Sequence, residues 1–130
     1  MTRSSRPASL AASLLSASLV LLSVSPASPH AIVLESSPVH DAVLERAPGQ
    51  VTLRFNSKIE KRFTRITLAA GDRAPAPIAL PGEDAAAPPD RVVIPLSPLA
   101  PGVYVLRYRV LAVDGHITEG ALRFTVGPPR

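Results

Sequence analysis

The sequence predicts an all-β fold, a Greek-key antiparallel β-sandwich or barrel of about seven strands with an Ig-like appearance. Two observations support this class. From residue 30 onward apolar and polar residues alternate, with the period of two that places one side of a strand in a core. The alternating segments are bounded by turn residues, and the chain holds 15 Pro and 7 Gly, which disfavour long helices.

Three strands are expected in the first half of the domain. Segment 31–38, AIVLESSP, is extended and ends at a proline. In segment 50–57, QVTLRFNS, the residues Val, Leu and Phe alternate with Thr, Arg and Asn, as in a half-buried strand. Segment 63–72, FTRITLAAGD, places Ile66 and Leu68 on one face and ends in a Gly-Asp turn.

Four more strands are expected in the second half. The Pro- and Ala-rich segment 74–89 is a long loop that holds at most a weak edge strand at 78–80, IAL. RVVIPL at 91–96 resumes the strand pattern. The longest strand is VYVLRYRVLAV at 103–113, and GALRFTV at 120–126 is the last, with alternate residues facing inward.

Residues 1–29 have the pattern of a secretion signal peptide. Arg3 and Arg6 precede an apolar run from Leu10 to Val24, and small residues and prolines follow. Removing the two arginines lowers Lys and Arg from 14 to 12 against 10 acidic residues, so the formal net charge falls from +4 to +2. The domain at 30–130 is therefore expected to be exported.

The composition limits the chemistry that the exported domain can perform. There is no Cys, and the only Met is Met1, so thiolate and thioether ligands are excluded. The domain has no basic tract or aromatic platform that would predict nucleic-acid binding. His, carboxylate, hydroxyl and backbone groups remain as functional groups.

A cluster of metal-binding side chains is suggested by the segment VLAVDGHITEGALRFTV, residues 110–126. Gly115 permits a tight turn that lets Asp114 and His116 converge. His30 stands just after the signal, and as a new N-terminus it would offer both an amine and an imidazole. Three nitrogens and one oxygen suit a tetragonal Cu(II) site and cannot make a blue-copper site. The alternative is a plain polar turn between two strands.

The chain resembles the copper resistance protein CopC family from His30 to about Val126. The matching blocks are HAIVLESSP, APGQVTLRFNSKIE, PLSPLAPGVYVLRYRVLAVDGHITEG and LRFTVG. The resemblance implies a Greek-key, cupredoxin-like fold that binds Cu(II) through His30, Asp114 and His116. Many members also carry a Met-rich loop for Cu(I), which this chain lacks, and Ser57 replaces an acidic residue of some members. A Cu(II)-only site is therefore implied.

The resemblance also implies a periplasmic binding protein rather than an enzyme. Its expected role is copper sequestration, copper resistance or delivery of the ion to an inner-membrane copper transport protein, and we expect a monomer. Cleavage directly before His30 would give the terminal amine to the site. Cleavage after Ala27 fits the small-x-small rule better and would leave Ser28 and Pro29 ahead of His30.

The sequence leaves three alternative functions. A metal-free Ig-like interaction module would use the Asp-Gly-His segment only as a turn. A histidine-brace copper monooxygenase is disfavoured by the small domain and the absence of Trp. A Ser-His-Asp hydrolase lacks a nucleophile elbow. His40 is expected to be a solvated turn residue, and the charged stretch 60–65 is expected to form an exposed strand edge.

Overall fold

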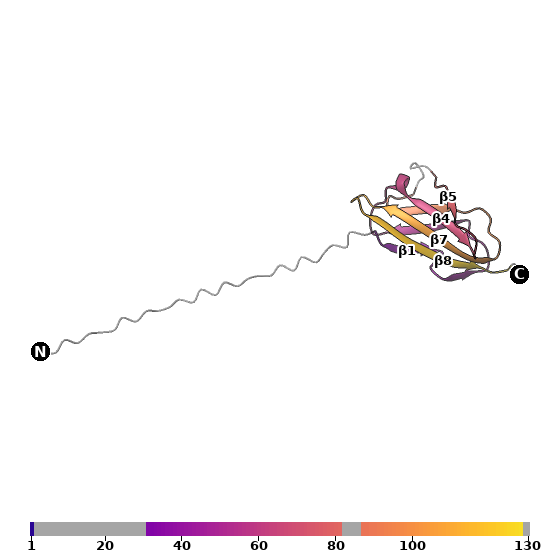
Figure 1. Cartoon of the computed structure of the whole chain (residues 1–130), viewed down its shortest axis with the longest axis horizontal. Coiled ribbons are helices and arrows are strands. Elements are labelled where there is room, and N and C mark those ends of the chain that lie inside the picture. The colour runs from indigo at the N-terminus through magenta and orange to yellow at the C-terminus, as the bar shows by residue number, and fades with distance from the viewer. Residues whose placement is uncertain (2–30, 82–86, 129–130) are drawn as a thin grey trace.

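Two β-sheets pack together in the computed structural model, which describes residues 1, 31–81 and 87–128. One sheet has the strand order β1-β3-β6 and the other has the order β2-β8-β7-β4-β5 (Figure 1). The elements are β1 (Val33–Ser37), β2 (Ala42–Leu44), β3 (Gln50–Phe55), the 3₁₀ helix η1 (Lys61–Phe63), β4 (Arg65–Ala70), β5 (Ala76–Ile78), β6 (Arg91–Pro95), β7 (Gly102–Leu111) and β8 (Ile117–Val126). The predicted all-β sandwich class is confirmed.

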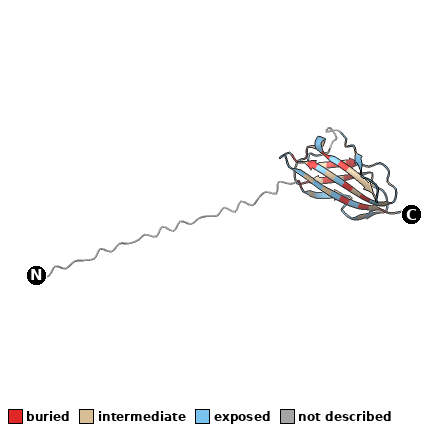
Figure 2. Ribbon diagram, in the orientation of Figure 1, coloured by how far each residue is buried: buried red, intermediate tan, exposed pale blue. Residues whose placement is uncertain are grey.

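The core is formed by the alternating residues that the sequence pattern placed inward. Buried and exposed positions alternate along the strands (Figure 2). Across the sandwich, Phe55 of β3 meets Tyr108 of β7 edge-on with ring centroids 5.9 Å apart. Within the five-stranded sheet, Tyr104 of β7 stacks on its partner Phe124 of β8 at 5.6 Å. The fully buried side chains include Val51, Leu53, Phe55, Val92, Ile94, Leu106, Val110 and Phe124. With no disulfide available, this apolar core carries the stability of the domain.

The largest departures from the predicted strands concern β2, β8 and β5. β2 was not predicted; it is three residues long and pairs in parallel with β8, so the sandwich has one parallel pair. β8 begins three residues earlier than expected, at Ile117, because its pairing with β7 extends to Leu111. The weak edge strand appears as β5, two residues before its predicted start.

The expectation that residues 60–65 form an exposed strand edge was wrong. Residues 61–63 form η1, and β4, which begins at Arg65, lies between β5 and β7. β5 pairs with β4 through Ile66, Thr67 and Leu68, so the weak strand supplies the edge instead. The charges of residues 60–65 alone could not indicate which strand would pair with the segment that follows them.

Gly120 makes room for the ring of Tyr108, its cross-strand partner. A methyl group built at Gly120 would collide with the phenol of Tyr108, and this ring packs edge-on against Phe55. We expect Gly120→Ala to lower the free energy of unfolding by about 1–3 kcal/mol, as overpacking does elsewhere. Gly49→Ala is the matched control, because a methyl group there meets no atom within 4 Å. Urea unfolding measures both, and equal effects would contradict this packing role.

Candidate metal centre

The β7–β8 turn presents Asp114 and His116 at one end of the sandwich. The strands pair as far as Leu111 and Ile117, and the Ala112 N–H donates to the His116 carbonyl at 2.9 Å. The Gly115 N–H donates to the Ala112 carbonyl at 2.9 Å, and Gly115 has a φ of 90°. A residue with a Cβ rarely adopts this conformation, so glycine at this position allows the three-residue hairpin loop.

The turn brings the two side chains together. Oδ1 of Asp114 accepts a hydrogen bond from the backbone N–H of His116 at 3.0 Å and lies 3.3 Å from Nδ1 of His116. About half of each side chain is exposed, 47% for Asp114 and 49% for His116. The His116 backbone N–H, followed by the His116 side chain, lowers the pKa of Asp114. An ionised carboxylate and an imidazole thus sit side by side on an accessible turn.

The first described residues of the domain are attached next to this turn. The Ile32 N–H donates to Oδ1 of Asn56 at 2.8 Å, and the Asn56 N–H donates to the Ile32 carbonyl at 3.0 Å. Two residues beyond Asn56, the Lys58 carbonyl accepts the Val113 N–H at 3.1 Å. One short segment therefore holds both the start of the domain and the turn. This role of Asn56 was not predicted from the sequence. The only indication was its position directly after an alternating strand.

The structure brings together two of the three predicted ligands. Asp114 and His116 are in contact, whereas His30 lies outside the described residues. Within residues 31–81 and 87–128, no group of three or more His, Asp or Glu side chains is arranged to hold a metal ion. The described pair would therefore need a further donor.

His40 belongs to a different part of the molecule. Its Nδ1 accepts the Arg123 N–H at 3.2 Å, and its Nε2 lies 3.4 Å from Oδ2 of Asp41. Arg123 is six residues along β8 from Ile117, a separation of roughly 20 Å. His40 thus contacts β8 far from the turn and is not simply a solvated residue, although its side chain is 57% exposed.

The ion pair between Asp41 and Arg123 is expected to make a small, pH-dependent contribution to the β2–β8 contact, because both side chains are about half exposed. The Arg123 Nε–H donates to Oδ1 of Asp41 at 2.6 Å, and this hydrogen bond holds the pKa of Asp41 below its ordinary value. The pair therefore contributes stability above the unfolded pKa, and the contribution is lost as the pH falls through the folded pKa. Arg123→Gln should raise the Asp41 pKa towards its ordinary value of 3.8. NMR titration of the carboxyl groups measures this pKa. Arg73→Gln removes the same charge elsewhere and is the control. Equal pKa values in both variants would contradict the assignment.

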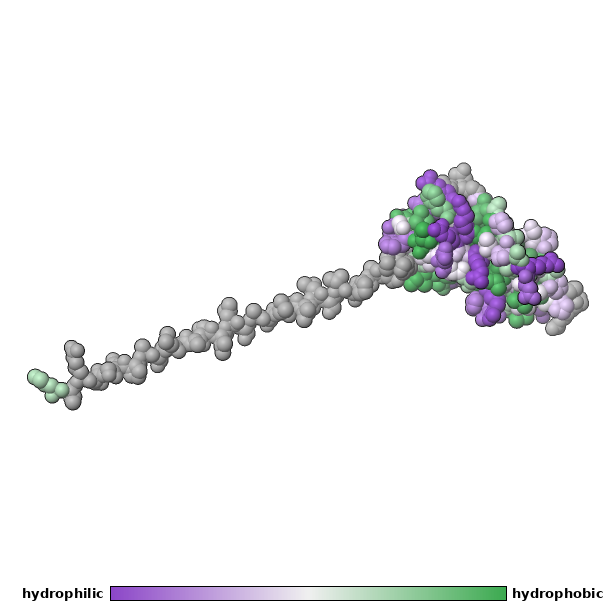
Figure 3. All heavy atoms as spheres, in the orientation of Figure 1, coloured by the Kyte–Doolittle hydropathy of each residue, from purple (hydrophilic) through white to green (hydrophobic). Residues whose placement is uncertain are grey.

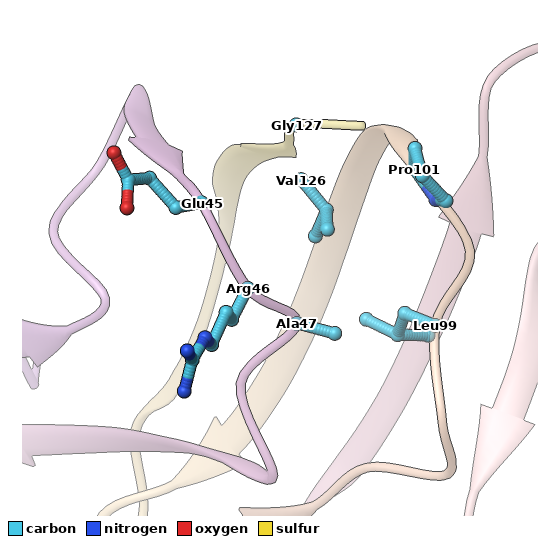
Figure 4. Close-up of a pocket in the computed structure, with 7 residues that line it drawn as sticks. All are labelled: Glu45, Arg46, Ala47, Leu99, Pro101, Val126 and Gly127. Atoms are coloured by element: carbon cyan, nitrogen blue, oxygen red, sulfur yellow. The ribbon is translucent and has the colours of Figure 1, made fainter. Parts of the chain in front are cut away.

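A hollow of about 430 Å³ lies at the other end of the long strands, beside Leu99, Val126 and Gly127. Figure 4 shows apolar side chains of Ala47, Leu99 and Val126 around it, while the charged ends of Glu45 and Arg46 point away. No set of polar groups converges there, so this hollow lacks the arrangement of a catalytic pocket.

The fold and the turn define a class, a small β-sandwich protein with an exposed carboxylate–imidazole pair at one end. A model of the CopC domain matches residues 33–127, and the chain belongs to the CopC family. None of the helices in the described part of the chain is long and apolar enough to cross a membrane.

Similarity to known proteins supports this family assignment. The chain is 30% identical to Protein YobA of Escherichia coli K12, covering 97% of this chain and 99% of the relative. It is 28% identical to Copper resistance protein C of Xanthomonas campestris pv. juglandis, covering 75% and 80%. The crystal structure of CopC from Methylosinus trichosporium OB3b matches with a TM-score of 0.69 at 30% identity, covering 78% and 97%. PcoC, a methionine-rich copper resistance protein of Escherichia coli, matches with a TM-score of 0.57 at 30% identity, covering 75% and 98%.

Proposed function

We propose that this protein binds one Cu(II) ion at the β7–β8 turn and acts in copper resistance. The observation that carries the proposal is the 3.3 Å contact between Asp114 and His116 on an exposed turn, beside the start of the domain. When two donor atoms bind one ion with bonds of about 2.0 Å, the two atoms lie roughly 3 Å apart. The distance between Oδ1 of Asp114 and Nδ1 of His116 matches this value. The names of the relatives concern copper resistance and not catalysis, in line with a binding protein rather than an enzyme.

The donor set favours the oxidised ion. Together with His30, the pair supplies two imidazoles and one carboxylate, a nitrogen and oxygen set that suits Cu(II). Soft ligands for Cu(I) are lacking, because the chain has no Cys and its only Met is Met1. In this respect the chain departs from PcoC, which is described as methionine rich.

Asp114 has two ways to contribute to such a site. It can bind the ion directly, because an aspartate is ionised at neutral pH and the contacts with His116 lower the pKa of Asp114 further. It can also accept a proton shared with Nδ1 of His116 and so orient the imidazole, with Nε2 as the ligating nitrogen, as carboxylates do at many metal-bound histidines. In both arrangements the ion stays accessible at the surface.

An exposed site at the end of a small domain suits transfer of the ion by ligand exchange. We propose that residues 1–29 direct export to the periplasm and that the domain stores copper there or passes it to an inner-membrane copper transport protein. A partner could approach the turn directly, since Val113 and Ile117 on either side of the pair are also exposed. No step of this role requires a covalent change in a substrate.

The test is a Cu(II) titration of the chain recovered after export, with its intact mass measured first to fix the N-terminus. The proposal predicts one Cu(II) retained per chain at neutral pH after gel filtration. It also predicts tighter binding when His30 is the first residue than when Ser28 precedes it, because the terminal amine then adds a nitrogen donor. A chain that retains no Cu(II) with either N-terminus would refute the proposal.

A further inference from the structure

Arginines gather on the outer face of the five-stranded sheet, away from the core. Arg65 on β4 stands directly opposite Arg109 on β7, and Arg107 stands opposite Thr67 in the next row. All three arginines are exposed. Figure 1 shows β4, β7 and β8 side by side, and in the same view Figure 3 shows bands of hydrophilic residues across the domain.

Few negative charges balance this arginine face, which we define as Arg65, Arg107 and Arg109. Glu119 on β8 pairs with Arg109 at 3.1 Å. Arg65 donates to the carbonyls of Arg62 and Thr64 at 3.3 and 3.2 Å. Among the described residues, no carboxylate forms an ion pair with Arg65 or Arg107. Like charges directly opposite each other destabilise a sheet, so the arrangement is unfavourable for the fold alone.

The opposite face of the sandwich is arranged differently. On the three-stranded sheet, Arg54 donates to both carboxylate oxygens of Glu35, at 3.0 and 2.7 Å. That bidentate contact neutralises the charge of Arg54 locally. Arg91 on β6 stands opposite Arg54, and its charge also acts on the Glu35 carboxylate. One carboxylate thus faces both opposed arginines of this sheet, whereas the described residues place no carboxylate in an ion pair with Arg65 or Arg107.

The arginine face is hollowed, with a volume of about 430 Å³ between the side chains. The three arginines line it together with Tyr108, Glu119 and the small residues Thr67, Gly120 and Ala121. A carboxylate on a short side chain could enter this space and accept hydrogen bonds from more than one guanidinium. A flat bilayer surface would meet the tips of the arginines and leave the hollow unfilled.

We propose that the arginine face is a docking surface for an acidic, extended segment of a partner protein. Guanidinium groups bind carboxylates in a bidentate fashion, and Arg107 and Arg109 are spaced by roughly 6.7 Å along β7, the spacing of alternate side chains in an extended peptide. Arg109 is two residues from the end of β7, so a docked segment would pass close to the β7–β8 turn. The surface is separate from the proposed metal ligands, and the proposal holds whether or not the turn binds copper.

Fluorescence anisotropy with fluorescein-labelled hexaglutamate tests this surface, with hexaglutamine as the uncharged probe. At an ionic strength of about 0.01 M, where screening is weak, we expect the purified protein to bind hexaglutamate and not hexaglutamine. Arg65→Gln/Arg107→Gln should weaken binding at least about tenfold, a difference of about 1.4 kcal/mol. Arg46→Gln/Arg73→Gln removes the same charge from exposed positions outside the face and should change binding by about twofold or less.

A variant that binds more tightly is a control, because unfolding of the protein could explain a loss of binding but not a gain. Glu119→Gln removes the carboxylate that competes for Arg109 and should strengthen hexaglutamate binding. Equal losses in the two double variants would overturn the proposal, as would binding to phosphatidylglycerol vesicles, dependent on Arg65 and Arg107, without binding to hexaglutamate. Copper titration of the same variants separates this result from the proposed function, because Arg65→Gln/Arg107→Gln should leave the Cu(II) stoichiometry unchanged.

Discussion

Replacing His116 by Ala is expected to weaken Cu(II) binding at least about 100-fold. The variant removes one of two proposed imidazole ligands, and losing even an outer hydrogen-bond partner of a ligand weakens metal binding about 10–100-fold. It also removes the side chain 3.3 Å from the Asp114 carboxylate. Competition with a chromophoric Cu(II) chelator at neutral pH measures the change.

The control for this variant is His40→Ala. Both histidines are about half exposed, 57% for His40 and 49% for His116, and both lie beside an aspartate. The two variants therefore change the composition in the same way, but His40 contacts Arg123 far from the turn. We expect His40→Ala to keep the Cu(II) affinity within about twofold, since small surface changes leave a distant site intact. Comparable losses in both variants would argue for non-specific binding by surface histidines.

Replacing Phe124 by Ala is expected to lower the free energy of unfolding by about 3–5 kcal/mol. Phe124 is fully buried, its ring stacks on Tyr104 with centroids 5.6 Å apart, and it lies on β8, which pairs with both β2 and β7. Small domains are stable by only about 5–15 kcal/mol, and this chain has no disulfide to limit the loss. Urea unfolding followed by circular dichroism measures the change.

Phe63→Ala is the matched control for the core variant. The Phe63 side chain is on η1, is 44% exposed and contacts the Arg62 guanidinium at 4.6 Å from the ring centroid. Removing it deletes the same atoms without opening a cavity, so the loss should stay near 1 kcal/mol or below. If both Phe variants lost equal stability, the core described around Phe124 would not be the main source of stability.

The fold was predictable where burial leaves a periodic pattern. Val51, Leu53 and Phe55 alternate with polar residues because one face of β3 packs on the core. β2 leaves no such pattern: it has three residues, and its place beside β8 depends on the backbone bond from Asp41 N–H to the Arg123 carbonyl. That contact joins residues 82 positions apart, which no local pattern encodes. For the same reason the sequence could not indicate that β5 would cover the edge of β4.

The candidate site was predictable in part. Asp114 and His116 converge because a glycine turn joins two long strands, and the chain itself encodes that local geometry. The hydrogen bonds of Asn56 and Lys58, which hold the start of the domain beside the turn, could not be predicted. They depend on how β3 lies against the start of the domain. His30 remains a prediction, since it lies outside the described residues and its amine depends on where processing cuts the chain.

The proposed position of Cu(II), at the β7–β8 turn beside the start of the domain, can be tested directly. Cu(II) is paramagnetic and broadens nearby NMR signals, so amide spectra recorded with one equivalent of the ion locate it directly. We expect the signals of Ala31, Ile32 and residues 112–117 to be lost and those of residues 40–46 and 102–105 to be retained. Selective broadening around His40, or at the hollow beside Leu99, would contradict it.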